Sequence, residues 1–558
     1  MVALLISIIF SAQFLYYSYG QSFLQVSALK YIGQTASVAG TVTSLLSPNL
    51  VLFFLNFFVV LAVAFFTFKK QKPQFQLRRY EKAGLFLLMV LVACAGYYVL
   101  VKQEDKEWGN SSRLYSDVYD LNTLVEKMGI VNFSFEDAFK YISRANLVTA
   151  ADRDVAEDWA EQKNTTQSSG PQKYAGIDKG KNIIFIQVES LENCDLNEWV
   201  NGQEVTPNLD ALAKSGVYFN NYYTQIGPGN TADAEFSTLN SLYPLQDDVI
   251  FVDYAQNTYN ALPSWLEKQG YGTYSLHGDV PTFWNRSNIY PNLGYKVQFS
   301  ESDYVKSRSI GKGPSDLGDE DFFLQSLQKM QSFKQPFFST LITISSHTPF
   351  ELPQDLQTLD LSNQDNLNYT QQQYLESIHY ADKAIGEFIE GFQKTPIYNN
   401  SVIFIYGDHG SFTNICGALG RDTVLPGLSN SQVPLVVLNS GVPAGPDTIA
   451  ASHIDLYPTI TNLLGIKPPT EILGQDVFNT KTPVVTHRNL FSGNINAILT
   501  DTMAFESNNN GVFEDSSCLS MPGKTPVPID QCKQLYDQQS DNVHISDTLI
   551  RGNLIKKQ

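Results

Sequence analysis

From Lys181 onward, short apolar runs rich in β-branched residues alternate with amphipathic segments. Continuous apolar runs of this length are typical of strands buried on both faces, and the amphipathic segments are typical of surface helices. The alternation predicts an α/β domain with a doubly wound, mostly parallel sheet covered by helices on both sides. The strand candidates are 183–188, 337–344, 402–406 and 434–438, and the helix candidates are 207–214, 232–242, 257–268, 369–392 and 456–464.

Three further apolar runs lie before residue 102, at about 2–19, 50–68 and 83–101. Each approaches the roughly 20 residues that a helix needs to cross a bilayer. The loop between the second and third runs carries six Lys or Arg residues. Because such loops stay in the cytoplasm, we predict a multi-pass protein of the cell membrane whose chain after the third run is extracytoplasmic.

The first run also allows a signal peptide. It lacks a basic n-region and a clear small-residue cleavage site, so we interpret it as a retained span. Charge supports the membrane assignment, because residues 1–102 hold eight Lys or Arg and one acidic residue. The rest of the chain holds 30 basic and 55 acidic residues, and so strong a negative balance argues against nucleic acid as a partner.

The regions after the predicted spans differ in composition. Residues 103–180 are expected to be a linker that is helical at first and then flexible, because 164–180 is rich in Gln, Ser, Thr and Gly. The α/β domain is expected over 181–480. Shorter alternating runs and turns after Thr480 predict a small β-rich C-terminal addition over 481–558.

The cysteines fit an extracytoplasmic domain. Cys94 lies inside the third apolar run, whereas Cys194, Cys416, Cys518 and Cys532 lie where disulfides persist. Four cysteines allow three pairings. Sequence proximity favours Cys518 with Cys532. Cys194 and Cys416 each follow a candidate metal-ligand segment, so their loops are expected to meet.

A glycine-rich loop, Gly-Pro-Gly-Asn-Thr at 227–231, runs straight into a predicted helix. Free backbone N–H groups and the dipole at a helix N-terminus favour negative charge, so a hydroxyl held there suits a phosphate ester. A threonine in this place is more often only a helix N-cap. As a nucleophile, Thr231 needs a metal ion or a base to activate it.

Candidate ligands for such an ion follow two of the predicted strands. Glu189 comes directly after 183–188, and Asp408 with His409 comes after 402–406. Ligands bind beyond the carboxyl ends of strands in open parallel sheets, so these side chains are placed to share one cation with Thr231. Taken alone, Glu189 is more often a solvated loop residue or helix cap, and the joint placement carries the prediction.

A third segment, 277–286, reads as a substrate wall. Arg286 is suited to clamp phosphate oxygens with its guanidinium fork, while His277 and Trp284 flank the ligand. The alternative is a loop with aromatic packing. His347 follows another predicted strand and is a candidate to protonate a leaving oxygen. His453, just before the predicted helix 456–464, is expected to position a turn.

These motifs resemble those of the lipoteichoic acid synthase family of membrane phosphoglycerol transferases, in the alkaline phosphatase and sulfatase superfamily. The resemblance covers about 181–475 and the membrane layout. It is carried by Gly-x-Gly-x-Thr-x-Asp-Ala-Glu-Phe at 227–236 and by the spacing of His277, Asp279, Trp284 and Arg286 in 277–286. It implies that one Mn²⁺ or Mg²⁺ ion is held by Glu189, Thr231, Asp408 and His409. It also implies that Thr231 is the nucleophile and that the glycerol phosphate is contacted or lined by His277, Asp279, Trp284, Arg286 and His347.

The resemblance further implies transfer of glycerol phosphate from phosphatidylglycerol to a lipoteichoic-acid-type polymer or a glycolipid, through a covalent threonine intermediate. A phosphoethanolamine transferase, a phosphoglycerol transferase acting on a glucan, and a catalytically silent membrane receptor remain alternatives. A sulfatase is disfavoured because its Cys/Ser-x-Pro-x-Arg motif does not occur. The family commonly has five spans, against three counted in this chain, which leaves the topology of the first run open.

Overall fold

The structure is a computed structural model of the chain. It describes residues 2–20, 23–24, 26, 46, 48–55, 57–59, 61–62, 65, 125, 129–143, 148–166, 172–310, 316–421, 423–489, 493–508 and 512–557. The described residues divide into an N-terminal unit, which ends at residue 143, and a larger unit, which begins at residue 148.

The N-terminal unit contains α1 (Val2–Gly20), the 3-10 helix η2 (Pro48–Phe54) and α7 (Ile130–Ser143). Helix α1 coincides with the first apolar run. None of the helices in the described ranges is both long and apolar enough to cross a membrane. The third apolar run, 83–101, and the basic loop before it lie outside the described residues, as does part of the second run. The three spans therefore remain predictions.

The larger unit is built on a nine-stranded sheet in the order β10-β4-β9-β8-β1-β7-β5-β6, with β11 also pairing to β4. Within its described strands, β9 alone runs antiparallel to its neighbours, so the prediction of a mostly parallel sheet is confirmed. The strands are β1 (Asn182–Val188), β4 (Val217–Tyr223), β5 (Gly272–His277), β6 (Val297–Phe299), β7 (Phe337–Ile342), β8 (Ser401–Gly407), β9 (Gln432–Leu438), β10 (Gly445–Asp447) and β11 (Ala451–Ser452).

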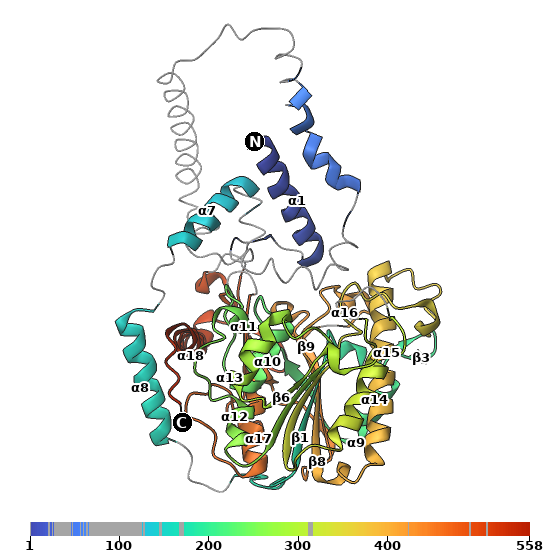
Figure 1. Ribbon diagram of the computed structural model, residues 1–558. Coiled ribbons are helices and arrows are strands. Elements are labelled where there is room, and N and C mark those ends of the chain that lie inside the picture. The colour runs from blue at the N-terminus through green and yellow to red at the C-terminus, as the bar shows by residue number, and fades with distance from the viewer. Residues whose placement is uncertain are drawn as a thin grey trace. The chain divides into compact units, whose positions relative to one another are not determined.

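Helices cover both faces of this sheet, as predicted (Figure 1). One face carries α9 (Pro207–Ser215), α14 (Asp319–Met330) and α15 (Tyr369–Gln393). The other carries α10 (Thr231–Asn240), α12 (Leu262–Glu267), α13 (Arg286–Leu293) and α17 (Leu456–Leu464). The helix expected over 257–268 is shorter than predicted and begins just before Pro263, a residue that suits the first turn of a helix.

Strand β1 shows how the two faces are filled. Ile184, Ile186 and Val188 pack into one hydrophobic core together with residues of α14 and α15. Phe185 points to the opposite face, where its ring lies edge-on to Phe338 and to aromatic rings of β8. Since successive side chains of a strand alternate between faces, an apolar run without interruption is what a strand covered on both sides requires.

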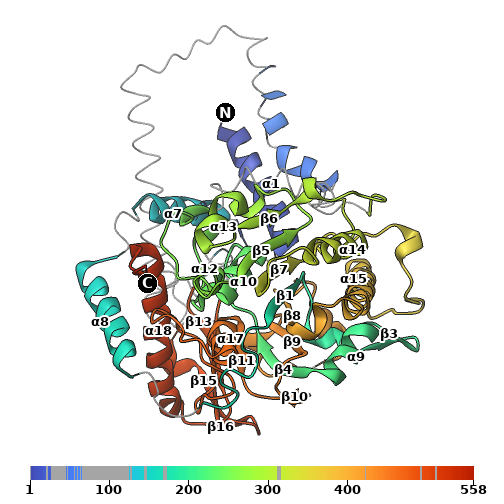
Figure 2. The same ribbon diagram turned by 60° about the horizontal axis from the view of Figure 1, so that its bottom comes forward.

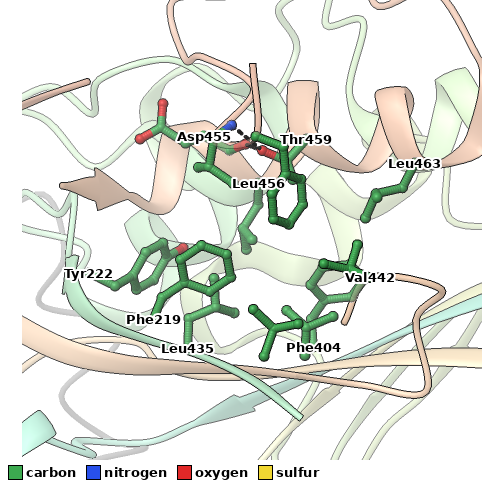
Figure 3. A pocket seen from close by; sticks show the side chains of 13 residues that line it. Phe219, Tyr222, Phe404, Leu435, Val442, Asp455, Leu456, Thr459 and Leu463 are labelled. Atoms are coloured by element: carbon green, nitrogen blue, oxygen red, sulfur yellow. Dashed lines mark hydrogen bonds between the residues drawn. The ribbon is translucent and has the colours of Figure 1, made fainter. Parts of the chain in front are cut away.

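The core on the α17 side is closely packed. Its cavity, about 10 Å³, lies between α17 and the strands and is lined by aromatic and aliphatic side chains, Phe219, Phe404, Leu435, Leu456 and Leu463 among them (Figure 3). A space of that size holds at most about one water molecule. It therefore belongs to the packing of the core and offers no room for a ligand.

A second, antiparallel sheet follows the chain order β12 (Val484–Arg488), β13 (Ile495–Thr500), β14 (Met503–Glu506), β15 (Ser517–Ser520) and β16 (Thr525–Val527). It matches the β-rich texture expected after Thr480. The chain then forms a helix that was not predicted, α18 (Lys533–Gly552), which lies beside α8 (Ala150–Thr166) (Figure 2). Shorter elements of the unit are β2 (Trp199–Val200), β3 (Gln203–Glu204), α11 (Ile250–Asp253) and α16 (Ile415–Ala418).

Candidate metal and phosphate site

Two neighbouring parallel strands, β1 and β8, end at the same edge of the sheet, with Val188 opposite Gly407. Glu189 follows the first strand and Asp408 with His409 follows the second, so the register alone brings these residues side by side. Helix α10 begins at Thr231 on the same side. The structure therefore brings together all four residues that the sequence proposes as ligands of one ion.

The four side chains lie within a few ångströms of one another. Candidate ligand atoms of Glu189, Asp408 and His409 all lie within 4.8 Å of each other. Thr231 Oγ1 donates a 3.2 Å hydrogen bond to Glu189 Oε2 and lies 3.4 Å from His409 Nε2. Each of the four residues is buried, with Thr231 the most exposed at 6%.

The group places two carboxylates, of Glu189 and Asp408, beside a single imidazole. Asp408 Oδ1 accepts hydrogen bonds from the backbone N–H groups of Ser190 and His409, whereas Oδ2 is buried with no hydrogen-bond partner among the described residues. Burial and the adjacent Glu189 carboxylate raise the pKa of Asp408. Burial alone would lower the pKa of His409, but the Asp408 and Glu189 carboxylates outweigh it and raise that pKa to about 10.

Such a group suits a divalent cation. Two buried carboxylates, an imidazole and a hydroxyl supply the oxygen and nitrogen donors that Mn²⁺ and Mg²⁺ bind. The unpartnered Oδ2 of Asp408 is an acceptor that a cation would satisfy. The donor set therefore fits a single ion held by Glu189, Thr231, Asp408 and His409.

The loop that precedes Thr231 is held by a residue that sequence reasoning missed. Asp233 Oδ2 accepts hydrogen bonds from the backbone N–H groups of Gly227, at 3.0 Å, and Gly229, at 2.7 Å. Between them and the helix, Asn230 adopts φ 42° and ψ −108°, a conformation that non-glycine residues rarely take. In the sequence Asp233 appears only as an acidic residue of the 227–236 motif, in the first turn of the predicted helix, and nothing there indicates its role.

His453 joins that loop to the end of β8, as its predicted positioning role requires. Its Nδ1 accepts from the backbone N–H of Gln225 at 3.1 Å, and Nε2 donates to the carbonyl of Gly407 at 3.0 Å. Burial lowers the pKa of His453 to about 4, so the ring is neutral at physiological pH.

The predicted substrate wall begins at the end of β5. His277 is buried, and its Nδ1 donates to the carbonyl of Ile342 at 3.0 Å, which leaves Nε2 as an acceptor. Burial and the charge of Arg286 lower the pKa of His277 to about 3. Asp279 is also buried; burial raises its pKa to about 6, and its Oδ2 has no hydrogen-bond partner in the described ranges. Trp284 is half-buried and has a positive φ of 50°.

Arg286 differs from the free clamp that the sequence suggested. Its Nε and Nη2 both donate to Oε1 of Glu235, at 3.1 and 2.7 Å, and the side chains of this ion pair are 3% and 1% exposed. Only Nη1 lacks a hydrogen-bond partner within the described part of the chain. Arg286 is thus buried beside the site with one edge available, and Glu235 is a second residue that sequence reasoning missed.

His347 lies beyond the end of β7 and is half-buried. Burial alone would raise the pKa of Glu189, but the charges of His409 and of the nearby His347 outweigh it and lower that pKa. Its loop is tied down at two points. Ser346 Oγ donates to the carbonyl of Glu189 at 2.6 Å, and the Asp319 carboxylate accepts from the backbone N–H groups of Ile344 and Ser345. The structure therefore places His347 at the edge of the metal-ligand group.

The pairing favoured for Cys518 with Cys532 is confirmed, and the loops that carry Cys194 and Cys416 do meet. Cys194 pairs with Cys416, and Cys518 pairs with Cys532. The first joins the segment after Glu189 to the segment after His409. Glu192 strengthens the same junction, since its Oε1 accepts from the backbone N–H and the hydroxyl of Ser411 at 2.8 and 2.7 Å.

Comparison with known proteins agrees with this arrangement. Residues 181–466 match the sulfatase family model, and residues 1–148 match the model of the lipoteichoic acid synthase N-terminal domain. Lipoteichoic acid synthase 1 of Bacillus subtilis is 31% identical over 492 residues, which cover 85% of this chain and 74% of that protein. The chain belongs to the lipoteichoic acid synthase family.

Other members of the family are similar over comparable lengths. The lipoteichoic acid synthase of Staphylococcus aureus is 29% identical over 540 residues, which cover 92% of this chain and 82% of that protein. The crystal structure of the lipoteichoic acid synthase LtaP from Listeria monocytogenes matches with a TM-score of 0.65 at 27% identity, over 71% of this chain and 98% of that chain. The chain is therefore a phosphotransferase with the sulfatase-like α/β fold of the alkaline phosphatase superfamily.

Proposed function

We propose that the chain is a membrane-anchored, Mn²⁺- or Mg²⁺-dependent phosphoglycerol transferase. It would move glycerol phosphate from phosphatidylglycerol to a glycerol phosphate polymer or glycolipid acceptor outside the cytoplasm. The names of the relatives support lipoteichoic acid as the product, and phosphatidylglycerol as the donor is what the family resemblance implies. The observation that carries the chemistry is the buried Thr231 hydroxyl, 3.2 Å from Glu189 and 3.4 Å from His409.

Glu189, Thr231, Asp408 and His409 would hold the ion, which when bound lowers the pKa of a ligating hydroxyl and polarises the phosphate. The chain's own residues prepare the nucleophile. Thr231 stands at the N-terminus of α10, where the helix dipole favours a negatively charged group. Glu189 Oε2 already accepts the hydrogen bond of the Thr231 hydroxyl and is placed to receive its proton.

In the first step, Thr231 Oγ1 forms a bond to phosphorus and the bond from phosphorus to the diacylglycerol oxygen breaks. His347, at the edge of the site, is the group that would give a proton to that oxygen. A glycerophosphoryl group then remains on Thr231. Arg286 Nη1 would offset negative charge on the phosphoryl group during the step.

In the second step, a hydroxyl of the acceptor would attack the same phosphorus and pass its proton to His347, while the bond from phosphorus to Thr231 Oγ1 breaks and that oxygen takes back the proton received by Glu189. His277 is neutral and presents Nε2 as an acceptor, so it can take a hydrogen bond from a substrate hydroxyl. The unpartnered Oδ2 of Asp279 offers a second acceptor in the same wall. A wall with two acceptors beside one cationic edge suits a ligand that carries both hydroxyls and a phosphate.

The test measures diacylglycerol release from fluorescent phosphatidylglycerol by the purified full chain in detergent micelles with Mn²⁺. We expect release by the parent and none by Thr231→Ala. Thr238→Ala is the matched control, because Thr238 is a buried threonine of the same helix whose hydroxyl bonds the backbone of that helix.

Thermal unfolding with and without Mn²⁺ accompanies the assay. Stabilisation of the parent by Mn²⁺ without release would exclude phosphatidylglycerol as donor and favour another lipid such as phosphatidylethanolamine. Neither release nor stabilisation would favour the catalytically silent receptor. Release by Thr231→Ala at the parent rate would refute the covalent mechanism.

A further inference from the structure

Helix α10 carries two groups of the candidate site one turn apart. Thr231 stands at its first position, and Glu235 follows four residues later. All ten residues of the helix are buried, so it is held on every side. A helix fixes side chains at positions i and i+4 on one face with little freedom between them. Whatever Glu235 holds is therefore held at a set offset from Thr231.

What Glu235 holds is Arg286. Two of the three guanidinium nitrogens donate to Oε1 of Glu235, and Oε2 accepts a hydrogen bond from the hydroxyl of Tyr290. The hydrogen bond from Tyr290 anchors the far oxygen, so the carboxylate is itself fixed in orientation. A buried ion pair of this kind needs such extra hydrogen bonds to offset the cost of removing both charges from water.

Arg286 lies close to the other residues of the predicted substrate wall, 277–286. The charge of Arg286 acts on His277, whose pKa it lowers, and on the carboxyl of Asp279. The guanidinium carbon also lies 6.0 Å from the ring centre of Phe283, in the same segment. Nη1 has no hydrogen-bond partner in the ranges that the structure describes, although it is buried. An unpartnered buried donor in this place points to an acceptor on a ligand.

We propose that Glu235 is a positioning residue that fixes the unpartnered edge of Arg286 at a set distance from Thr231, so that nucleophile and phosphate-binding edge are aligned through one helix. The inference rests on the proposed function. It assigns the role of Glu235 to its length and hydrogen bonds rather than to its charge. Arginine has several rotatable bonds, so without this anchor its planar fork would be free to turn away.

Two substitutions separate position from charge. Glu235→Gln removes the charge but keeps the length and an oxygen that accepts from Nε and Nη2. Glu235→Asp keeps the charge but withdraws the carboxylate by one methylene, about 1.5 Å. Because a misplacement of about 1 Å can lower a rate by about 100-fold, we expect kcat for diacylglycerol release to fall by that order in Glu235→Asp.

Glu235→Gln is expected to retain kcat within about 10-fold, because its amide oxygen still accepts from the guanidinium. A factor of ten corresponds to about 1.4 kcal/mol of transition-state energy. The reverse order, with Glu235→Asp active and Glu235→Gln inactive, would overturn the proposal. Glu376→Asp is the matched control: this glutamate is buried on α15 and accepts two backbone hydrogen bonds on the opposite face of the sheet. It should leave kcat unchanged.

A purely structural role is excluded by repeating both substitutions with Arg286→Lys, which cannot form the fork. The effect of Glu235→Asp on kcat should then shrink to within about threefold, because interacting residues are not additive. An unchanged effect in that background would overturn the proposal. Thermal unfolding of each variant identifies any loss of folded protein.

Binding of glycerol phosphate to the full chain, measured by calorimetry, separates this inference from the proposed function. One possible result is that the parent does not act on phosphatidylglycerol, but that the parent and Glu235→Gln bind glycerol phosphate equally tightly and Glu235→Asp binds it more weakly. In that case the positioning role stands and the proposed donor fails. Equal binding by all three proteins, or no binding by the parent, would overturn the positioning role.

Discussion

Substituting Gly227 would test how closely the loop 227–230, which precedes the proposed nucleophile Thr231, is packed. A Cβ at this position would lie 2.1 Å from the carbonyl oxygen of Leu245 and 3.1 Å from Asp233 Oδ2. Ordinary Cβ contacts begin at 3.4 Å, so Gly227→Ala needs a displacement of about 1.3 Å from Leu245. The first clash is with backbone, which cannot swing aside, and overpacking of this kind typically costs about 1–3 kcal/mol.

The displacement would reach Thr231, because the same segment is tied to it by Asp233. Gly227 donates its N–H to Asp233 Oδ2, two residues beyond the nucleophile. Thr231 Oγ1 is already 3.2 Å from Glu189 Oε2, so a shift of 1 Å would break that hydrogen bond. Misplacement on this scale can lower a rate by about 100-fold. We therefore expect kcat for diacylglycerol release to fall by about two orders of magnitude.

Two glycines serve as controls for this variant. At Gly216 an added Cβ would lie 2.5 Å from the carbonyl oxygen of Val437, but Gly216 precedes β4 at the end of the sheet opposite the site. Gly216→Ala should lower the melting temperature and leave the rate per folded molecule intact. Gly523→Ala, with no contact under 3.5 Å, should change neither. Full turnover by Gly227→Ala, or an equal loss of turnover in Gly216→Ala, would refute the reasoning.

The two disulfides should have separable effects, measured by chemical unfolding and by calorimetric titration with Mn²⁺. Replacing either pair of cysteines by serine should lower the free energy of unfolding by about 2–4 kcal/mol. Only Cys194→Ser with Cys416→Ser should weaken Mn²⁺ binding, whereas Cys518→Ser with Cys532→Ser should leave it unchanged. Equal Mn²⁺ affinity in the two double variants would contradict this. Acid should destabilise the fold through His453, because burial holds its pKa at about 4 and the unfolded chain takes up the proton first. The free energy of unfolding should fall by up to about 3 kcal/mol between pH 6.5 and pH 4, and His453→Asn should remove that part of the slope; an identical slope in the variant would show that other groups are responsible.

The sheet and the place of the site were predictable for one physical reason. A strand covered on both faces needs mostly apolar residues, so β1, interrupted only by Gln187, and β8 show in the sequence as apolar runs whose ends agree with the structure to within one residue. Polar residues directly after such runs must lie at one edge of the sheet. Glu189 and Asp408 were found in this way, although their role as ligands stays a prediction.

Other features could not be found because they depend on contacts between distant parts of the chain. The pairing of Arg286 with Glu235 joins residues 51 positions apart, and no local pattern encodes it. Helix α18 was missed because its polar character, with a buried stripe that includes Val543 and Leu549, resembles the turn-rich chain before it. The helix expected from residue 257 was too long because residues 257–261 are irregular chain before Pro263.

The distances along the chain within the site have a consequence for biosynthesis. Thr231 contacts a residue 42 positions before it and another 178 positions after it. A polypeptide synthesised only as far as α15 contains the hydroxyl but lacks Asp408 and His409, and it also lacks β8, which brings them into place. In a truncated or half-folded chain, Thr231 would therefore lack the residues that are proposed to activate it. Activity against membrane lipid would arise only in molecules that have completed the central sheet.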